Sequence, residues 1–114
     1  MRNEYPLYLN GVWTPQTDGC VREDIEPATG KPLFAVHRAG PADVETALAS
    51  AAAAFPGWAA AMADVRERVL LRAADIMESR AEEFVELLVR EGGKAQSIAR
   101  GEFAGSVNLF RVAA

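Results

Sequence analysis

The first forty residues alternate short apolar runs with turn-forming residues, which is typical of paired β-strands. Asn10-Gly11 separates two such runs, and this dipeptide strongly favours a two-residue type I′ turn between antiparallel strands. Farther along, Pro27-Ala28-Thr29-Gly30 has the residue types of a turn between two extended stretches. The pattern therefore predicts a hairpin followed by a pair of strands. The expected strands are residues 5–10, 12–14, 21–25 and 33–39.

From Pro41 onward the apolar spacing becomes helical. Proline is well placed as the first residue of a helix, where its missing N–H costs no hydrogen bond. The sequence Phe55-Pro56-Gly57-Trp58 is expected to end or kink this helix, because proline and glycine are poor helix continuers. An apolar stripe at i, i+4, i+7 and i+11 runs along one face and consists of Val44, Leu48, Ala51 and Phe55.

Three further helices are expected, which makes about four in all. Asp64 with Glu67, and Ser79 with Glu82, have the spacing of capping boxes at helix starts. Gly92-Gly93 is a typical helix stop. The last helix should cover residues 95–114, with an apolar face made of Ala99, Phe103, Val107, Phe110 and Ala114.

Composition places the chain among soluble globular proteins. Half of the 114 residues are hydrophobic, a quarter are charged, and the mean hydropathy is close to zero. No apolar run approaches the roughly 20 residues of a membrane-spanning helix, and the start lacks the apolar core of a signal peptide. We therefore expect a cytoplasmic protein with no membrane partner. The net charge of −4, without a basic cluster, argues against nucleic acid as a partner.

Residues able to carry chemistry are few. Cys20 is the only cysteine, so no intrachain disulfide can form, and its acidic neighbours disfavour the reactive thiolate. His37, the only histidine, lies in an alternating strand with no evident partner, and we interpret both as ordinary strand residues. Gly92-Gly93-Lys94 lacks the earlier glycine and the following Ser or Thr of a phosphate-binding loop. A solvated helix face is the expected role of Glu82, Glu83 and Glu86.

Six motifs resemble, in order along the chain, the N-terminal part of the aldehyde dehydrogenase superfamily. Residues 8–13 are similar to its opening (Y/F)-I-N-G-x-W hairpin, and residues 25–31 to its x-N-P-A-T-G-E turn, with Glu26 in place of the usual Asn. Residues 43–58 resemble its D-V-x-x-A-V-x-x-A-x-x-A-F-x-x-W helix. The remaining matches are Arg68, Leu71, Ala74 and Asp75 in the next helix, Glu91–Lys94 at an E-x-G-K corner, and Glu102-Phe103 at an E-V or E-I pair.

The resemblance implies an α+β fragment of the α/β coenzyme-binding domain of that family. Residues 1–114 would be a single N-terminal segment, with a β-hairpin and strands at 1–40 and helices at 41–114. Family enzymes oxidise aldehydes to carboxylic acids with NAD or NADP through a cysteine thioester. Their catalytic cysteine, general-base glutamate and oxyanion-hole asparagine lie downstream of this region. The chain is therefore expected to hold no catalytic and no cofactor-binding residue, and to be inactive alone.

The resemblance also carries two roles to particular positions of this sequence. The positions that match the wall of the family's aldehyde tunnel, on the last helix, are Glu102, Ser106 and Leu109. The positions that match a Na⁺ or K⁺ site are Asp24 and Ile25, through their backbone, and Glu91, through its carboxylate.

The leading interpretation is thus a scaffold and tunnel-wall segment of an NAD(P)-dependent aldehyde dehydrogenase. Its implied partners are an aldehyde substrate, the remainder of the enzyme and further copies of it in a homo-oligomer. The alternative interpretation is a stand-alone, non-catalytic α+β module. Such a module would act by self-association or protein binding, because apolar faces of this size require a partner.

Overall fold

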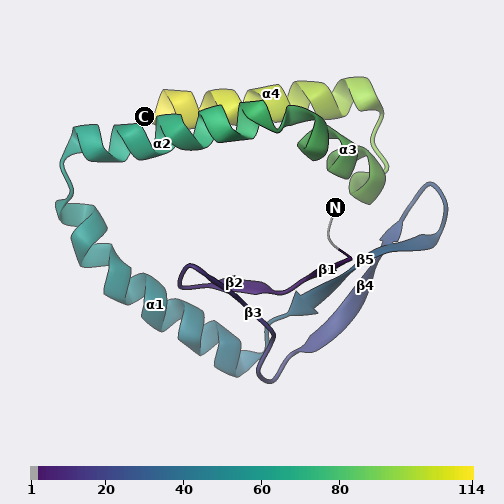
Figure 1. Ribbon diagram of the computed structural model, residues 1–114, viewed down its shortest axis with the longest axis horizontal. Helices are drawn as coiled ribbons and strands as arrows, with labels where there is room; N and C mark the ends of the chain where they lie inside the picture. Colours follow the sequence, from purple (N-terminus) through teal and green to yellow (C-terminus); the bar gives the residue numbers. More distant parts are fainter. Residues whose placement is uncertain (1–2) are drawn as a thin grey trace. The chain divides into compact units, whose positions relative to one another are not determined.

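A computed structural model of the chain describes residues 3–114, which form five strands and four helices (Figure 1). They divide into two compact units, one built from residues 3–26 and 30–60 and the other from residues 27–29 and 61–114. The α+β class and the four helices confirm the prediction. The strands are Glu4–Tyr5 (β1), Leu7–Leu9 (β2), Val12–Thr14 (β3), Cys20–Glu26 (β4) and Lys31–Arg38 (β5). The helices are Pro41–Ala60 (α1), Ala63–Ser79 (α2), Ala81–Gly92 (α3) and Gln96–Ala113 (α4).

The predicted hairpin is formed by β2 and β3. The two strands pair antiparallel with Tyr8 opposite Trp13, and the centroids of these two rings lie 5.0 Å apart. Asn10 and Gly11 have φ angles of 49° and 80°, as the two central residues of a type I′ turn require. The dipeptide therefore sets the register of this hairpin.

The expected single strand over residues 5–10 is wrong, because Pro6 divides it into two strands that join different sheets. Glu4 and Tyr5 pair in parallel with Ala35 and Val36 of β5, whereas β2 belongs to the hairpin. Proline has no N–H to donate to a β-ladder, so the chain changes its pairing partner there.

The predicted strand pair is formed by β4 and β5, which run antiparallel on either side of the turn at residues 27–30. The Gly30 N–H donates to the Glu26 carbonyl oxygen at 2.8 Å, and Gly30 has a φ of 68°. The strand order is β1-β5-β4, and the register of β4 against β5 shifts between Asp24 and Ile25. This order leaves β4 at the outer edge of the three-stranded sheet.

Helix α1 begins at Pro41 as predicted, but it continues through Pro56 to Ala60. Of the two expected effects of residues 55–58, an end of the helix is therefore wrong, and a kink stays a prediction. Pro56 removes one backbone donor, but only a short final turn follows it, so most of the helical hydrogen bonds are unaffected. The apolar stripe along this helix is exposed at Val44, Leu48, Ala51 and Phe55.

The second unit is a small helical bundle, in which α4 lies along α2 and also contacts α3 (Figure 1). The rings of Phe84 and Phe103 stack with their centroids 5.3 Å apart. The predicted packed face of the last helix is confirmed at three positions, whereas Phe110 and Ala114 are exposed. The buried core residues are Ala74, Val85, Ala99, Phe103 and Val107.

Neither predicted capping box forms in the described part of the chain. The N-cap of α2 is Met62 and that of α3 is Arg80, and neither position has a side-chain cap hydrogen bond. Because α2 begins at Ala63, Asp64 lies inside its first turn, where it pairs with Arg68 at 2.9 Å. The Ser79 hydroxyl donates backward to the Ile76 carbonyl oxygen.

The predicted stop of α3 is confirmed. Gly93 has a φ of 63° and occupies the C-cap position in the left-handed conformation. Within residues 3–114 no single helix has both the length and the apolar composition to cross a membrane; α1 and α2 reach those limits only when counted together.

Candidate functional site

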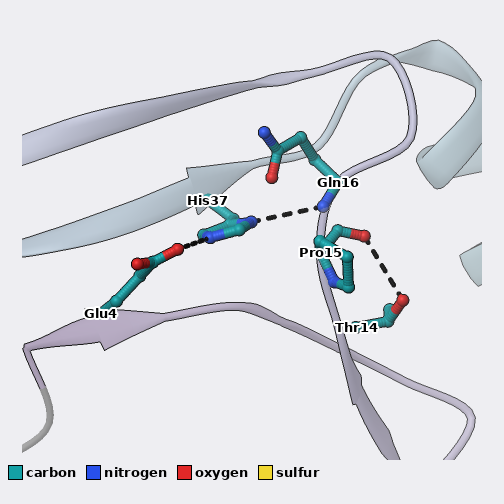
Figure 2. Close-up of polar contacts among 5 residues, drawn as sticks. All are labelled: Glu4, Thr14, Pro15, Gln16 and His37. Carbon is teal, nitrogen blue, oxygen red and sulfur yellow. Dashed lines mark hydrogen bonds and ion pairs between the residues drawn. The ribbon is translucent and has the colours of Figure 1, made fainter.

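His37 is the centre of a short polar chain in the first unit. It is buried on β5, and Figure 2 shows its ring between the Glu4 carboxylate on one side and the backbone of Gln16 on the other. Nε2 of His37 bonds Glu4 Oε1, and Nδ1 accepts a hydrogen bond from the Gln16 N–H at 3.3 Å. The histidine therefore joins β1, β5 and the loop after β3.

These contacts define the tautomer of the neutral His37 ring. Nδ1 accepts the Gln16 N–H, so it cannot carry a hydrogen itself, and the ring hydrogen lies on Nε2. Nε2 then donates to the Glu4 carboxylate. With both ring nitrogens occupied by protein groups, His37 acts here as a structural tie.

The sheet geometry separates His37 from Cys20. His37 lies opposite Val21 in the register of β4 and β5, so these two side chains share one face. Cys20 directly precedes Val21 on β4 and therefore points to the other face, where it is exposed. The two residues do not form a nucleophile–base pair in this geometry.

Two carboxylates organise the start of α1. Asp43, only 2% exposed, accepts hydrogen bonds from the Thr17 N–H at 2.8 Å and from the Gly40 N–H at 3.0 Å. Asp18, in the loop before β4, accepts a hydrogen bond from the Ala42 N–H at 3.1 Å. Its carboxylate thus caps the first turn of α1, because Gly40, the residue before the helix, has no side chain to do so. The hydrogen bond from Gly40, followed by those from Thr17, lowers the pKa of Asp43 against the opposing effect of burial.

The three candidate tunnel residues lie on α4 in the second unit, and all three are exposed. The Ser106 hydroxyl donates to the Glu102 carbonyl oxygen at 2.9 Å, and the Glu102 carboxylate pairs with Lys94 Nζ at 2.5 Å. Leu109 is 68% exposed. The helix thus presents a polar and an aliphatic group away from the face that Phe103 packs into the core.

Ion pairs fasten α4 to its neighbours. Arg100 donates two hydrogen bonds to the Glu82 carboxylate of α3, at 2.6 and 2.7 Å, and this lowers the pKa of Glu82. Arg111 contacts two carboxylates of α2, those of Asp75 at 3.1 Å and Glu78 at 2.7 Å. These contacts fix the orientation of the face that carries the tunnel candidates.

The candidate cation ligands come from both units. Asp24 and Ile25 are consecutive on β4, and Glu91 lies in the last turn of α3 with an exposed side chain. Asp24 Oδ2 is buried and has no hydrogen-bond partner within residues 3–114. A buried carboxylate oxygen without a donor suits a cation, because burying such an atom unpaired is costly. No group of three His, Cys, Asp or Glu side chains in that range is placed to hold a metal ion.

Sequence reasoning missed the partners of His37 and the role of Asp43. The bond between His37 and Glu4 joins residues 33 positions apart, and that between Asp43 and Thr17 joins residues 26 apart. One signal was available for Asp43, because it stands in the first turn of a helix that begins with proline, where an acidic side chain meets free N–H groups. No comparable local signal marks His37.

Comparisons of the sequence with known proteins all indicate the same family. The model of the aldehyde dehydrogenase family matches residues 13–114. A betaine aldehyde dehydrogenase of Rhizobium etli is 46% identical over 87 residues, which are 76% of this chain and 18% of that protein. An aldehyde dehydrogenase of Aspergillus niger is 35% identical over 106 residues, covering 92% of this chain and 21% of the relative.

Solved structures agree with the sequence matches. An NAD-dependent benzaldehyde dehydrogenase from Corynebacterium glutamicum superposes with a TM-score of 0.87 at 30% identity, over 91% of this chain and 23% of that one. A salicylaldehyde dehydrogenase from Pseudomonas putida G7 gives a TM-score of 0.92 at 28% identity, over 98% and 23%. The chain therefore spans about a fifth of the length of the proteins that it matches.

Proposed function

The chain belongs to the aldehyde dehydrogenase family, and from this premise we propose that it is the N-terminal segment of an enzyme that oxidises an aldehyde to a carboxylic acid. The match over residues 13–114 carries this proposal, together with relatives of which the matched residues make up only about a fifth. In the proposed reaction a cysteine of the remaining polypeptide forms a thioester with the substrate. NAD or NADP, when bound, supplies the hydride acceptor.

The proposed role of this segment is scaffold and tunnel wall, without catalytic or cofactor-binding residues. Hydride transfer needs a bound nicotinamide and a reactive thiolate, and exposed Cys20 lies on the other face of the sheet from His37, the only histidine of the chain. We expect the 114-residue chain to give no aldehyde-dependent rise in NADH absorbance, and the full-length parent to give one. Turnover by the short chain would contradict the scaffold role, and a parent inactive on every aldehyde of a broad panel would contradict the enzyme proposal.

The tunnel-wall proposal concerns the exposed face formed by Glu102, Ser106 and Leu109. In the full-length parent, Ser106→Trp should change relative kcat/KM values among aldehydes of different size, because an indole would narrow the space beside the helix. Ser97→Trp is the matched control, since Ser97 is an exposed serine at the other end of α4. Equal aldehyde preferences in the Ser106→Trp variant and the wild type would overturn the tunnel-wall role.

The cation proposal assigns Na⁺ or K⁺ to the backbone of Asp24 and Ile25 and the carboxylate of Glu91. The unpaired buried Asp24 Oδ2 supports a cation at this strand. Glu91→Gln should weaken the dependence of the parent's melting temperature on Na⁺ or K⁺ at constant ionic strength. Glu86→Gln removes another exposed carboxylate from α3 and is the control. An unchanged cation response in Glu91→Gln would remove Glu91 from the site.

The parent is further proposed to be a cytoplasmic homo-oligomer with no membrane or nucleic-acid partner. The absence of a basic cluster in a chain of net charge −4 supports the last point. Cell fractionation together with light scattering of the purified parent tests this assignment. A monomeric parent, or one recovered with membranes, would contradict it.

A further inference from the structure

β4 is an edge strand of the three-stranded sheet. β5 pairs with one edge of β4, and within residues 3–114 no strand pairs with the other edge. Five of its seven residues are exposed, and Asp24 and Glu26 are half-buried. Val21 is 49% exposed and Ile25 45%. Such an edge presents unpaired N–H and C=O groups together with apolar side chains.

The sequence of β4 is complementary to itself when it is read in the opposite direction. Around Glu23 as the midpoint, Val21 mirrors Ile25 and Arg22 mirrors Asp24. In an antiparallel pair of copies, Val21 of each copy would therefore lie opposite Ile25 of the other, and Arg22 of each copy opposite Asp24 of the other. Arg22 has no ion-pair partner among the residues that the structure describes, so its charge is available to a partner.

From this complementarity we infer that two copies of the chain associate through their β4 strands, forming a continuous antiparallel sheet across a two-fold axis at Glu23. The axis would be perpendicular to the sheet, so the equivalent faces of the two copies form one continuous face. Odd-numbered residues of one copy then lie opposite odd-numbered residues of the other, and even-numbered opposite even-numbered. Val21 and Ile25 pair on one face, and Arg22 and Asp24 pair on the other. Cross-strand pairs of these two kinds stabilise antiparallel sheets.

The neighbouring registers pair fewer residues of β4 with each other. A two-fold axis at Arg22 would place the two guanidinium groups opposite each other, and an axis at Asp24 would do the same for two carboxylates. Like charges directly opposite are destabilising. The register centred on Glu23 has one such contact, between the two Glu23 side chains, and overlaps all seven residues of both strands. Each of the three registers has one like-charge contact, so it is the longer overlap that favours the register centred on Glu23.

The association should be weak and should stop at two copies. One pair of seven-residue strands buries less than the roughly 1,600 Å² of a standard protein interface, so the dimer should form only at high protein concentration. Each copy uses its one free β4 edge, so the contact closes on itself. The inference depends on this strand and does not depend on the proposed aldehyde chemistry.

A charge exchange tests the pairing in the 114-residue chain by sedimentation equilibrium. The wild type should show a concentration-dependent dimer, and Arg22→Asp should weaken it by about tenfold or more, because like charges then face each other. Arg22→Asp combined with Asp24→Arg restores opposite charges at both pairs and should recover the dimer. A wild type that stays monomeric, a larger assembly, or an undiminished Arg22→Asp dimer would overturn the inference.

Cysteine cross-linking tests the register without altering Asp24. In a Cys20→Ser background, Glu23→Cys places one thiol on the axis, where opposing Cα atoms are about 4.5–5.5 Å apart and within disulfide range. Val21→Cys is the control, since its two copies would lie about 13 Å apart along the strands. Rapid oxidative dimer formation by Glu23→Cys alone is expected. Equal cross-linking of both variants, or none in either, would overturn the proposed register.

Discussion

Gly19 lies directly against the backbone carbonyl group of Arg38, so closely that a Cβ atom at Gly19 would stand 1.8 Å from that oxygen. A Cβ atom at Gly40 would likewise stand 2.3 Å from Asp18 Oδ1. The loop before β4, the end of β5 and the start of α1 therefore meet at a point where two positions admit only glycine.

Replacing Gly19 with alanine should destabilise the first unit. The new methyl group would meet backbone atoms, which cannot move aside as a side chain can, and overpacking of this kind costs about 1–3 kcal/mol. Gly57→Ala is the matched control, because a Cβ atom there meets nothing within 4 Å among the described residues. That variant should raise the free energy of unfolding by about 0.5–1 kcal/mol, since Gly57 lies in α1. Urea titrations would measure both changes, and equal stability of the two variants would refute the steric argument.

Asp43 should make the stability of the first unit depend on pH in the acid range. Hydrogen bonds from Gly40 and Thr17 lower its pKa in the folded state, so its contribution is complete above the ordinary aspartate pKa of about 3.9. The contribution is lost as the pH falls through the lower pKa of the folded state. Asp43→Asn should destabilise the chain at pH 7 and reduce the loss of stability on acidification. Urea titrations from pH 2.5 to 7 would detect this, with exposed Glu45→Gln as the control.

Glu4 should hold β1 on the sheet. Glu4→Ala removes the acceptor for His37 Nε2 and should speed amide hydrogen exchange at Tyr5 and Val36, which pair across β1 and β5. Glu4→Gln keeps an acceptor oxygen and should retain most of the protection. Hydrogen exchange followed by NMR distinguishes the two variants. Unchanged exchange in Glu4→Ala would show that the backbone pairing and the Tyr5–Phe34 ring contact are sufficient.

Two positions on α4 should respond very differently to truncation. Phe103 is 7% exposed and stacks on Phe84, so Phe103→Ala should cost about 3–5 kcal/mol in the stability of the second unit. Leu109 is 68% exposed, and Leu109→Ala should change the stability of the 114-residue chain by no more than about 0.5 kcal/mol. Thermal unfolding followed by circular dichroism compares them. A large loss in Leu109→Ala would show that this face is covered.

Features set by neighbouring residues were predictable from the sequence. The turn at Asn10-Gly11, the first residue of α1 at Pro41 and the end of α3 at Gly93 each follow from the backbone preferences of one or two residues. The packed face of α4 at Phe103 was equally predictable, because helical spacing alone places Phe103 on one face with Ala99 and Val107.

Features set by distant residues were not predictable. The break at Pro6 was visible in the sequence, but the pairing of Tyr5 with β5 was not, because the position of β5 depends on the whole sheet. The two capping patterns failed because a cap requires a helix boundary at one particular residue, and periodicity locates a boundary only within a few residues. Of the candidate sites, the sequence pattern placed Glu102, Ser106 and Leu109 together, whereas it gave no indication of the tie at His37.

The pairing of β1 with β5 also implies an order of folding. Glu4 and His37 are 33 positions apart, and closing a loop of that length has an entropic cost that the adjacent pair β4–β5 does not bear. The hairpin of β4 and β5 should therefore form first and provide the template on which β1 is added. During synthesis, β1 must remain unpaired until its partners on β5, Ala35 and Val36, have emerged from the ribosome.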